Sequence, residues 1–246
     1  MPPVFWSLED AGIRFREGTV SIIAGTPGSQ KTGLALALVA SWNLPTLYLS
    51  CDSEDFEMVE RVAAWRTGDA MTTVRRNPAA YAEALAGLPI RFTFEDSPTY
   101  SDVEHEVAAY GEVFGAWPKV IVVDNLLNLV GENENEWGAH RDHMRVVHKL
   151  ARITGATVLV LAHMADDQKD PGAVPQGRTK LQGKVSHLPK LIVSLAFDGQ
   201  VLKAAAVKNR FGPASASGEN YAALFTDPAR NQFFDTRDQW MRARSA

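Results

Sequence analysis

The sequence predicts an α/β fold: a doubly wound, mostly parallel sheet with helices on both faces and an antiparallel hairpin near the C-terminus. Short apolar runs alternate with longer amphipathic stretches along the chain. Most of these runs are continuously apolar, which is typical of parallel strands that are covered on both faces. Strands and helices in alternation also imply right-handed crossovers, which build a doubly wound sheet.

Seven apolar runs are the predicted strands, and a short turn separates the last two. The sequence of that turn, FDGQ at residues 197–200, predicts a hairpin appended to the parallel core. In chain order the predicted strands are Val20–Ala24, Thr46–Ser50, Ile90–Phe94, Val120–Asp124, Thr157–Ala162, Leu191–Phe197 and Val201–Lys208.

Five stretches with helical patterning lie between the early strands and are the predicted helices. The third of them stops next to Gly87, and glycine commonly ends a helix. In chain order the predicted helices are Thr32–Ser41, Asp55–Thr67, Ala79–Ala86, Ser101–Phe114 and His140–Thr154.

We expect these elements to form a single domain, residues 1–246, because the chain contains no internal repeat and no low-complexity linker. Its expected core runs from about residue 18 to about residue 225. The remaining tail, 226–246, is polar but contains Phe233, Phe234 and Trp240. We expect this tail either to pack on a neighbour or to fray.

Composition and charge exclude several classes of protein. The formal net charge of −4 gives no global attraction to nucleic acid, so any such binding must come from a local basic patch. A single cysteine, Cys51, excludes an internal disulfide framework and fits a reducing cytoplasm. No apolar run approaches membrane-spanning length, and the N-terminus lacks the pattern of a signal peptide. We therefore expect a cytoplasmic protein with no membrane partner.

The segment GTPGSQKT, residues 25–32, lies between the first predicted strand and the first predicted helix. A phosphate-binding loop needs converging backbone N–H groups, a lysine for the outer phosphates and a hydroxyl for Mg²⁺. Lys31 and Thr32 supply the last two, and the positive end of the following helix points at the bound anion. The other loop residues, of which the glycines and the proline shape the turn, are Gly25, Thr26, Pro27, Gly28, Ser29 and Gln30.

Gln30 departs from the usual phosphate-loop pattern, because it stands where the second glycine is expected. A side chain at this position can point away from the phosphates if its backbone angles lie in an allowed region. The alternative is a Gly/Pro turn that happens to contain Lys-Thr. The strand before the segment and the helix after it favour a nucleotide site.

Polar residues follow three of the predicted strands. Asp124 ends one strand and could hold Mg²⁺ through water, although Asp also favours helix caps and turns. Asp52 or Glu54, after another strand, could orient an attacking water, and a helix-capping role competes for Asp52. Cys51, beside Asp52, is expected to be a small buried filler. His163 ends a third strand and could sense the γ-phosphate, where the alternative is a solvated surface histidine.

A basic segment rich in glycine and proline follows the strand of His163. No acidic residue occurs from Pro171 to Phe197. Such cations contact nucleic-acid phosphates without sequence preference, although a solvated basic loop is the alternative. We expect a mobile loop that binds single-stranded DNA. The candidate DNA-binding residues are Arg178, Lys180, Lys184 and Lys190.

Taken together, these motifs resemble the RecA-like ATPases and, within them, the DnaB-type replicative helicases. The segment VKNRFGPASASG, residues 207–218, carries the resemblance, because DnaB-type proteins have a Lys-x-Arg-x-Gly-Pro segment after a late strand. In that family the Lys and Arg project into the nucleotide site of the adjacent subunit. By this match Lys208 and Arg210 are trans-acting groups.

The other site residues also match the family pattern. Lys31 and Thr32 match the phosphate-loop pair, Asp124 the metal-organising acid and His163 the polar sensor. Asp52 stands where the family has a catalytic Glu. The match runs from about residue 18 to about residue 225 and is similar to the short, core-only helicases of actinobacterial bacteriophages.

The resemblance implies an ATP-dependent DNA motor with a RecA-like fold. It implies ATP and Mg²⁺ bound between subunits of a homo-oligomer, a hexameric ring, with single-stranded DNA gripped by the basic loop in the central channel. A phage-encoded protein of this kind would work in the host cytoplasm. In this reading, loss of the γ-phosphate felt at His163 moves the basic loop.

Two other functions stay open at this stage. The first is a RecA-like recombination or repair ATPase that forms filaments without unwinding DNA. The second is a metal-dependent nuclease, because hard carboxylates and imidazoles could bind Mn²⁺ or Mg²⁺. Its candidate ligands are Glu132, Glu134, His140, Asp142, His143, Asp166 and Asp167, although their spacing matches no specific ligand pattern.

Overall fold

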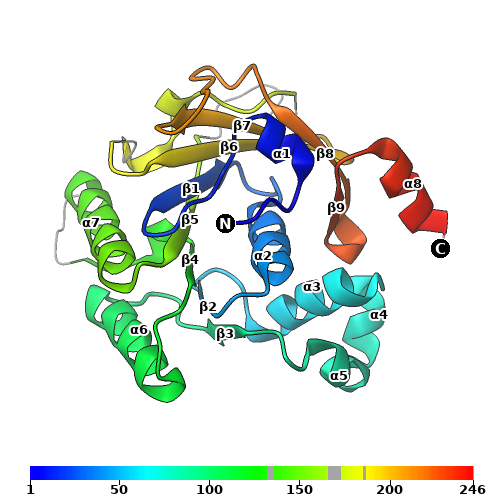
Figure 1. The fold of residues 1–246 in the computed structure, drawn as a ribbon, viewed down its shortest axis with the longest axis horizontal. Coiled ribbons are helices and arrows are strands. Elements are labelled where there is room, and N and C mark those ends of the chain that lie inside the picture. The colour runs from blue at the N-terminus through cyan, green and yellow to red at the C-terminus, as the bar shows by residue number, and fades with distance from the viewer. Residues whose placement is uncertain (132–135, 166–172, 185–186, 246) are drawn as a thin grey trace.

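A computed structural model describes residues 1–131, 136–165, 173–184 and 187–245 (Figure 1). Within these residues the strands form one nine-stranded sheet in the order β3-β2-β4-β5-β1-β6-β7-β8-β9. The strands are β1 (Val20–Gly25), β2 (Thr46–Ser50), β3 (Ile90–Thr93), β4 (Val120–Asp124), β5 (Thr157–His163), β6 (Leu191–Phe197), β7 (Val201–Asn209), β8 (Ala222–Asp227) and β9 (Gln232–Phe234).

The predicted doubly wound sheet is confirmed. The strands from β3 to β6 in the sheet order pair in parallel, and β6, β7, β8 and β9 pair antiparallel. All residues of β1, β2 and β4 are buried, as expected for parallel strands that are covered on both faces. The carboxyl ends of β1, β2, β4 and β5 therefore meet at one edge of the sheet, where ligands bind in open α/β folds.

Helices cover both faces of this sheet, as Figure 1 shows. One apolar core joins α1, α2 and α3 to the sheet, and a second core joins α6 and α7 to the opposite face. The helices are α1 (Trp6–Asp10), α2 (Lys31–Trp42), α3 (Asp55–Thr67), α4 (Met71–Arg76), α5 (Ala82–Leu85), α6 (Tyr100–Phe114), α7 (Glu136–Thr154) and α8 (Arg237–Ser245).

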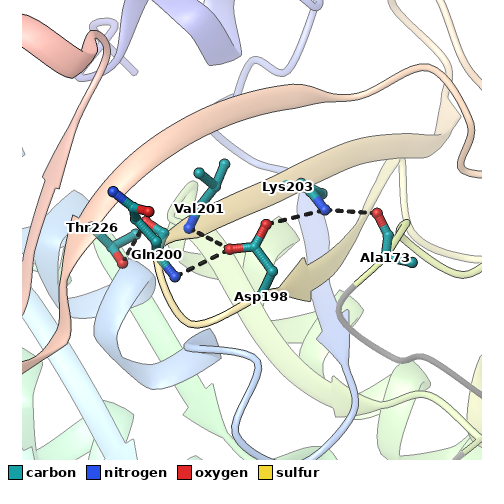
Figure 2. A network of polar contacts seen from close by, with 6 residues as sticks. All are labelled: Ala173, Asp198, Gln200, Val201, Lys203 and Thr226. Atoms are coloured by element: carbon teal, nitrogen blue, oxygen red, sulfur yellow. Dashed lines mark hydrogen bonds and ion pairs between the residues drawn. The ribbon is translucent and has the colours of Figure 1, made fainter.

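The predicted hairpin is formed by β6 and β7, and Figure 2 shows the polar contacts at its tip. The Asp198 carboxylate accepts hydrogen bonds from the backbone N–H groups of Gln200 and Val201 at 3.1 and 2.8 Å. Lys203 Nζ lies 3.2 Å from the same carboxylate and donates to the Ala173 carbonyl at 2.7 Å. The hairpin is thus joined to the segment that starts at residue 173.

The C-terminal region differs from the prediction. Instead of a tail that begins near residue 226, β8 and β9 extend the sheet, and α8 follows them. Phe233 and Trp240 are buried, and Trp240 Nε1 donates to the Thr226 carbonyl at 2.8 Å. These two aromatic side chains therefore pack on the chain's own sheet.

The predicted helix at 79–86 is also wrong in part. The chain there forms a 3₁₀ turn, Pro78–Tyr81, followed by the single helical turn of α5. No residue of these two elements is buried, so no apolar face supports a longer helix. Among the described residues, no helix has both the length and the apolar character needed to cross a bilayer.

Candidate functional site

The loop between β1 and α2 surrounds the ammonium group of Lys31. Lys31 is buried, and its Nζ donates to the carbonyls of Gly25 and Thr26 at 3.1 and 3.0 Å. A Cβ atom at Gly25 would collide with Ser29 Oγ, so only glycine fits at the end of β1. Ser29 Oγ is itself buried without a hydrogen-bond partner. The loop therefore places the Lys31 ammonium group and the unsatisfied Ser29 hydroxyl beside the N-terminus of α2.

Gln30 takes the backbone conformation that the usual glycine would take. Its φ of 63° and ψ of 25° lie in the left-handed region, which is small but allowed for a side chain. Its Oε1 lies 3.3 Å from where a Cβ atom at Gly33 would be, so the side chain folds back over the first turn of α2. The backbone of the loop therefore keeps the conformation that a glycine would give it, at a conformational cost of about 1–2 kcal/mol for Gln30.

We expect substitutions at Gln30 to change stability according to this left-handed conformation. Gln30→Val should lower the free energy of unfolding by about 1–2 kcal/mol, because a β-branched residue is disfavoured at positive φ. Gln30→Gly should be neutral or slightly stabilising, because glycine has no such penalty. Urea unfolding measures the free energy of unfolding of both variants. Equal midpoints for Gln30→Val and the wild type would contradict the left-handed conformation.

One carboxylate oxygen of Asp124 accepts two hydrogen bonds at the end of β4. Thr32 Oγ1 donates to Asp124 Oδ2 at 2.8 Å, and the Tyr48 hydroxyl donates to the same oxygen at 2.9 Å. Burial raises the pKa of Asp124, while the two hydrogen bonds act in the opposite direction. The predicted pair, Thr32 and Asp124, is therefore in direct contact, and Tyr48 orients the carboxylate from the neighbouring strand β2.

Asn125 connects two other predicted site residues. Its Nδ2 lies 3.4 Å from Asp52 Oδ2 and 3.4 Å from His163 Nε2. The pKa of His163 is lowered by burial first and by the charge of Lys31 second, which favours the neutral imidazole, while Asp52 acts in the opposite direction. Asp52, Asn125 and His163 thus form a polar row across the carboxyl ends of β2, β4 and β5.

Glu54 and Cys51, close to Asp52 in the sequence, differ in their exposure to solvent. Glu54 is exposed and stands at the N-cap position of α3, where its side chain makes no capping hydrogen bond. Cys51 is buried, and burial together with nearby carboxylates raises the pKa of its thiol to about 12. A thiol that stays protonated at neutral pH is a filler in the core, as the sequence predicts, and not a nucleophile.

Lys208 and Arg210 lie beside the amino end of β6, whereas the phosphate loop lies at the carboxyl end of β1, on the opposite edge of the sheet. Gly25 pairs with Leu195 of β6, whereas Asn209 pairs with Leu191, at the start of the same strand. Leu191 and Leu195, which mark these two positions, are about 13 Å apart along β6. These two cations are therefore separated from their own chain's Lys31 by most of the length of a strand.

The basic segment is tied to the end of β5. Met164 forms a β-bridge with Leu181, and the Ala165 N–H donates to the Lys180 carbonyl at 2.9 Å. The described part, 173–184, contains two 3₁₀ turns, Arg178–Lys180 and Gln182–Lys184, and Leu181 is buried in the core under α7. The loop that the sequence predicts as mobile thus has local structure in this part.

The four predicted DNA-binding residues occupy different places. Arg178 and Lys180 are exposed in the first of these turns. Lys190 precedes β6, and its carbonyl accepts a hydrogen bond from the Arg210 N–H at 2.9 Å. Lys184 lies in the second 3₁₀ turn, and its side chain is outside the described part of the structure.

The predicted nuclease ligands do not form a site in the described part of the chain. His143 is buried and packs edge-on against the ring of Tyr100, and Asp142 pairs with Arg145 at 2.7 Å. Among the described residues, no cluster of three or more His, Cys, Asp or Glu side chains could hold a metal. Glu132, Glu134, Asp166, Asp167 and the side chain of His140 lie outside the described residues.

Sequence reasoning missed Tyr48 and Asn125. Asn125 had a signal, because it directly follows the strand-end acid Asp124. Tyr48 had none, because it lies inside a buried strand and resembles any other core aromatic. Its contact with Asp124 depends on the pairing of Tyr48 with Val122 across β2 and β4. That register places Tyr48 and Asp124 on the same face as diagonal neighbours.

Comparisons with known proteins show what this chain is similar to. Residues 2–169 match the family described as AAA domain. The gene 65 protein of Mycobacterium phage L5 is 30% identical over 238 residues, which are 91% of this chain and 88% of that protein. The gene 65 protein of Mycobacterium phage D29 is 31% identical over 218 residues, which are 82% of this chain and 93% of that protein.

Two solved structures show the same fold at low sequence identity. One is a separate ATPase domain, which matches with a TM-score of 0.82 and 14% identity, over 96% of this chain and 91% of that one. The other is a DnaB-like replicative helicase, which matches with a TM-score of 0.81 and 14% identity, over 95% of this chain. This chain spans only 61% of the length of that helicase chain.

The fold is therefore that of the RecA-like ATPase domains found in DnaB-like helicases. The family match covers more than half of the chain, and the two phage proteins are related to it over most of its length. The protein belongs to the AAA domain family.

Proposed function

We propose that the protein is an ATP-dependent DNA motor, a DnaB-like helicase that hydrolyses ATP at the interfaces of a ring. One observation carries the proposal: Lys31, Thr32 and Asp124 cluster at one edge of the sheet, whereas Lys208 and Arg210 lie at the other. A chain built in this way does not bring both sets of residues to one nucleotide. In this proposal a second copy, packed head to tail, supplies the distant cations, and such heterologous contacts form a ring when the rotation between copies closes.

The residues of the loop fit a triphosphate and a divalent cation. Lys31 Nζ is held by two neutral carbonyls, and a phosphate would replace these acceptors with charged ones. Thr32 Oγ1 and the Asp124 carboxylate are hard oxygen donors of the kind that Mg²⁺ prefers together with phosphate and water oxygens. When bound, Mg²⁺ neutralises part of the negative charge on the phosphates.

The polar row at the strand ends supports roles for three more residues. Asp52, which contacts Asn125, orients the attacking water in this proposal; Glu54, exposed at the N-cap of α3, is the second candidate. His163 stays neutral and acts as a hydrogen-bonding sensor of the γ-phosphate. Asn125 holds Asp52 and His163 in one arrangement, so that a change at one is felt at the other.

The path from His163 to the basic segment supports coupling between ATP and DNA. Met164, the residue after His163, forms the β-bridge to Leu181, which lies next to Lys180. A displacement of His163 is therefore transmitted to the basic turn through a single residue. In this proposal Lys180 and Lys184 contact the phosphates of single-stranded DNA without sequence preference.

We expect ATP hydrolysis to be stimulated by single-stranded DNA and to drive strand displacement on a forked duplex. The measurement compares unwinding with ATP and with a non-hydrolysable analogue, using a blunt duplex as the control substrate. DNA-stimulated hydrolysis without strand displacement would favour the recombination or repair ATPase instead. Electron microscopy of the assembly separates rings from filaments.

A further inference from the structure

Two of the residues predicted to bind DNA lie beside the two predicted to act in trans. A β-bulge shifts the register of β6 and β7 between Ile192 and Val193, so that Lys208 stands opposite Ile192. Bulges re-aim side chains, and this one places Lys208 on the face of the core under α7, the core to which Ile192 belongs. Lys190 directly precedes β6, and its charge is one of those that act on Lys208.

The backbone around Lys208 fixes these neighbours in place. Lys208 Nζ donates to the His187 carbonyl at 3.0 Å, and the Arg210 N–H donates to the Lys190 carbonyl at 2.9 Å. The Arg178 N–H donates to the carbonyl of residue 216 at 2.9 Å. Residue 215, just before residue 216, donates its N–H to the carbonyl of residue 206 in β7 at 2.8 Å. The backbones of the four residues are thus connected by hydrogen bonds, and Lys208 adds one from its side chain.

The charges of this group act on one another. Burial comes first, followed by the charges of Arg210, Arg178 and Lys190, and together they lower the pKa of Lys208 to about 8. Holding like charges close together costs free energy that an opposing anion recovers. The arrangement is therefore that of a receptor for a multiply charged anion.

The chain's own nucleotide site has the complementary charge. Asp52, Glu54 and Asp124 outnumber Lys31 there, and bound ATP adds further negative charge. A neighbouring cavity of about 400 Å³ at the ends of β2 and β3 is lined by further acids, Glu95, Asp102 and Glu106. The acids just named thus lie near the phosphate loop, whereas the charges that act on Lys208 are those of cations.

We propose that Arg178 and Lys190 join Lys208 and Arg210 in one four-cation group that binds the phosphates of the ATP held by the next copy of the chain. The proposal rests on the proposed function, because it deepens the trans role of Lys208 and Arg210. It moves Arg178 and Lys190 from the DNA channel to the interface between subunits. Lys180 and Lys184 remain the DNA contacts of the segment.

The test separates turnover from DNA affinity in Arg178→Ala and Lys190→Ala. We expect each variant to lower ATP turnover about 10-fold or more at saturating oligonucleotide, because an aligned cation is lost from the developing charge. Fluorescence anisotropy should show that the Kd for a labelled single-stranded oligonucleotide changes less than about twofold. Lys190→Arg keeps the charge and should restore a large part of the turnover.

Two further variants make the outcomes distinguishable. Lys180→Ala is the contrast, because its expected loss is in oligonucleotide affinity, and Arg242→Ala on α8 is an exposed control outside both surfaces. Normal turnover of Arg178→Ala and Lys190→Ala at saturating oligonucleotide would overturn the four-cation group, whatever their DNA affinity. If Arg210→Ala also turned over normally, the trans mechanism itself would fail.

Discussion

Lys31→Ala is expected to abolish ATP turnover, with a loss of at least about 100-fold. Lys31 is the buried cation of the phosphate loop, and its Nζ is held by the carbonyls of Gly25 and Thr26. Without it the loop offers the outer phosphates no cation of its own, and neutral donors and the dipole of α2 are what it retains. Binding of a fluorescent ATP analogue and steady-state phosphate release measure the two parts of this loss.

The control for this prediction is Lys119→Ala, an exposed lysine just before β4, at the opposite end of the strand from Asp124. Lys31→Met keeps the apolar length of the side chain and separates the lost charge from a disturbed loop. Unchanged ATPase activity in both Lys31 variants would defeat the assignment of residues 25–32 as a phosphate loop.

Arg210→Ala should leave ATP binding largely intact and remove DNA-stimulated hydrolysis. An arginine that acts across an interface is worth roughly 10³–10⁵ in rate, which corresponds to about 4–7 kcal/mol of barrier. Because Arg210 follows the end of β7, at the far edge of the sheet from Gly25, its removal spares the loop that binds ATP. Nucleotide affinity and turnover, measured on the same preparation, should therefore separate in this variant.

The parallel part of the fold was predictable because its strands are buried on both faces. The runs that form β1, β2, β4 and β6 are apolar almost throughout, and the structure places them within about one residue of the predicted ends. The predicted helix Asp55–Thr67 and the observed α3 agree at both ends.

The C-terminal strands were not predictable for a physical reason. In β8 buried and half-buried residues alternate over part of its length, and β9 is only three residues long. Such segments become strands because β7 offers an edge on which they can pair, which is a tertiary effect. The five-residue helix α1 is equally short and carries little periodicity.

The chemistry of the site was predictable from single residues, and its geometry was not. Lys31, Thr32 and Asp124 follow from residue type and from their place at strand and helix ends. The contact of Tyr48 with Asp124 depends on the register of two strands, and the direction of Lys208 depends on a bulge. Neither register nor bulge leaves a clear pattern in one sequence.

The central claim is that ATP bound by one copy of the chain is cleaved with cations from the next copy. Assembling Lys31→Ala together with Arg210→Ala, with single-stranded DNA and ATP saturating, tests it most directly. Each variant alone lacks one half of every site and should hydrolyse little ATP. We expect the mixture to regain hydrolysis, because an interface between the phosphate loop of an Arg210→Ala copy and the cations of a Lys31→Ala copy is complete. A mixture that hydrolyses no more ATP than the two variants do separately would contradict the claim.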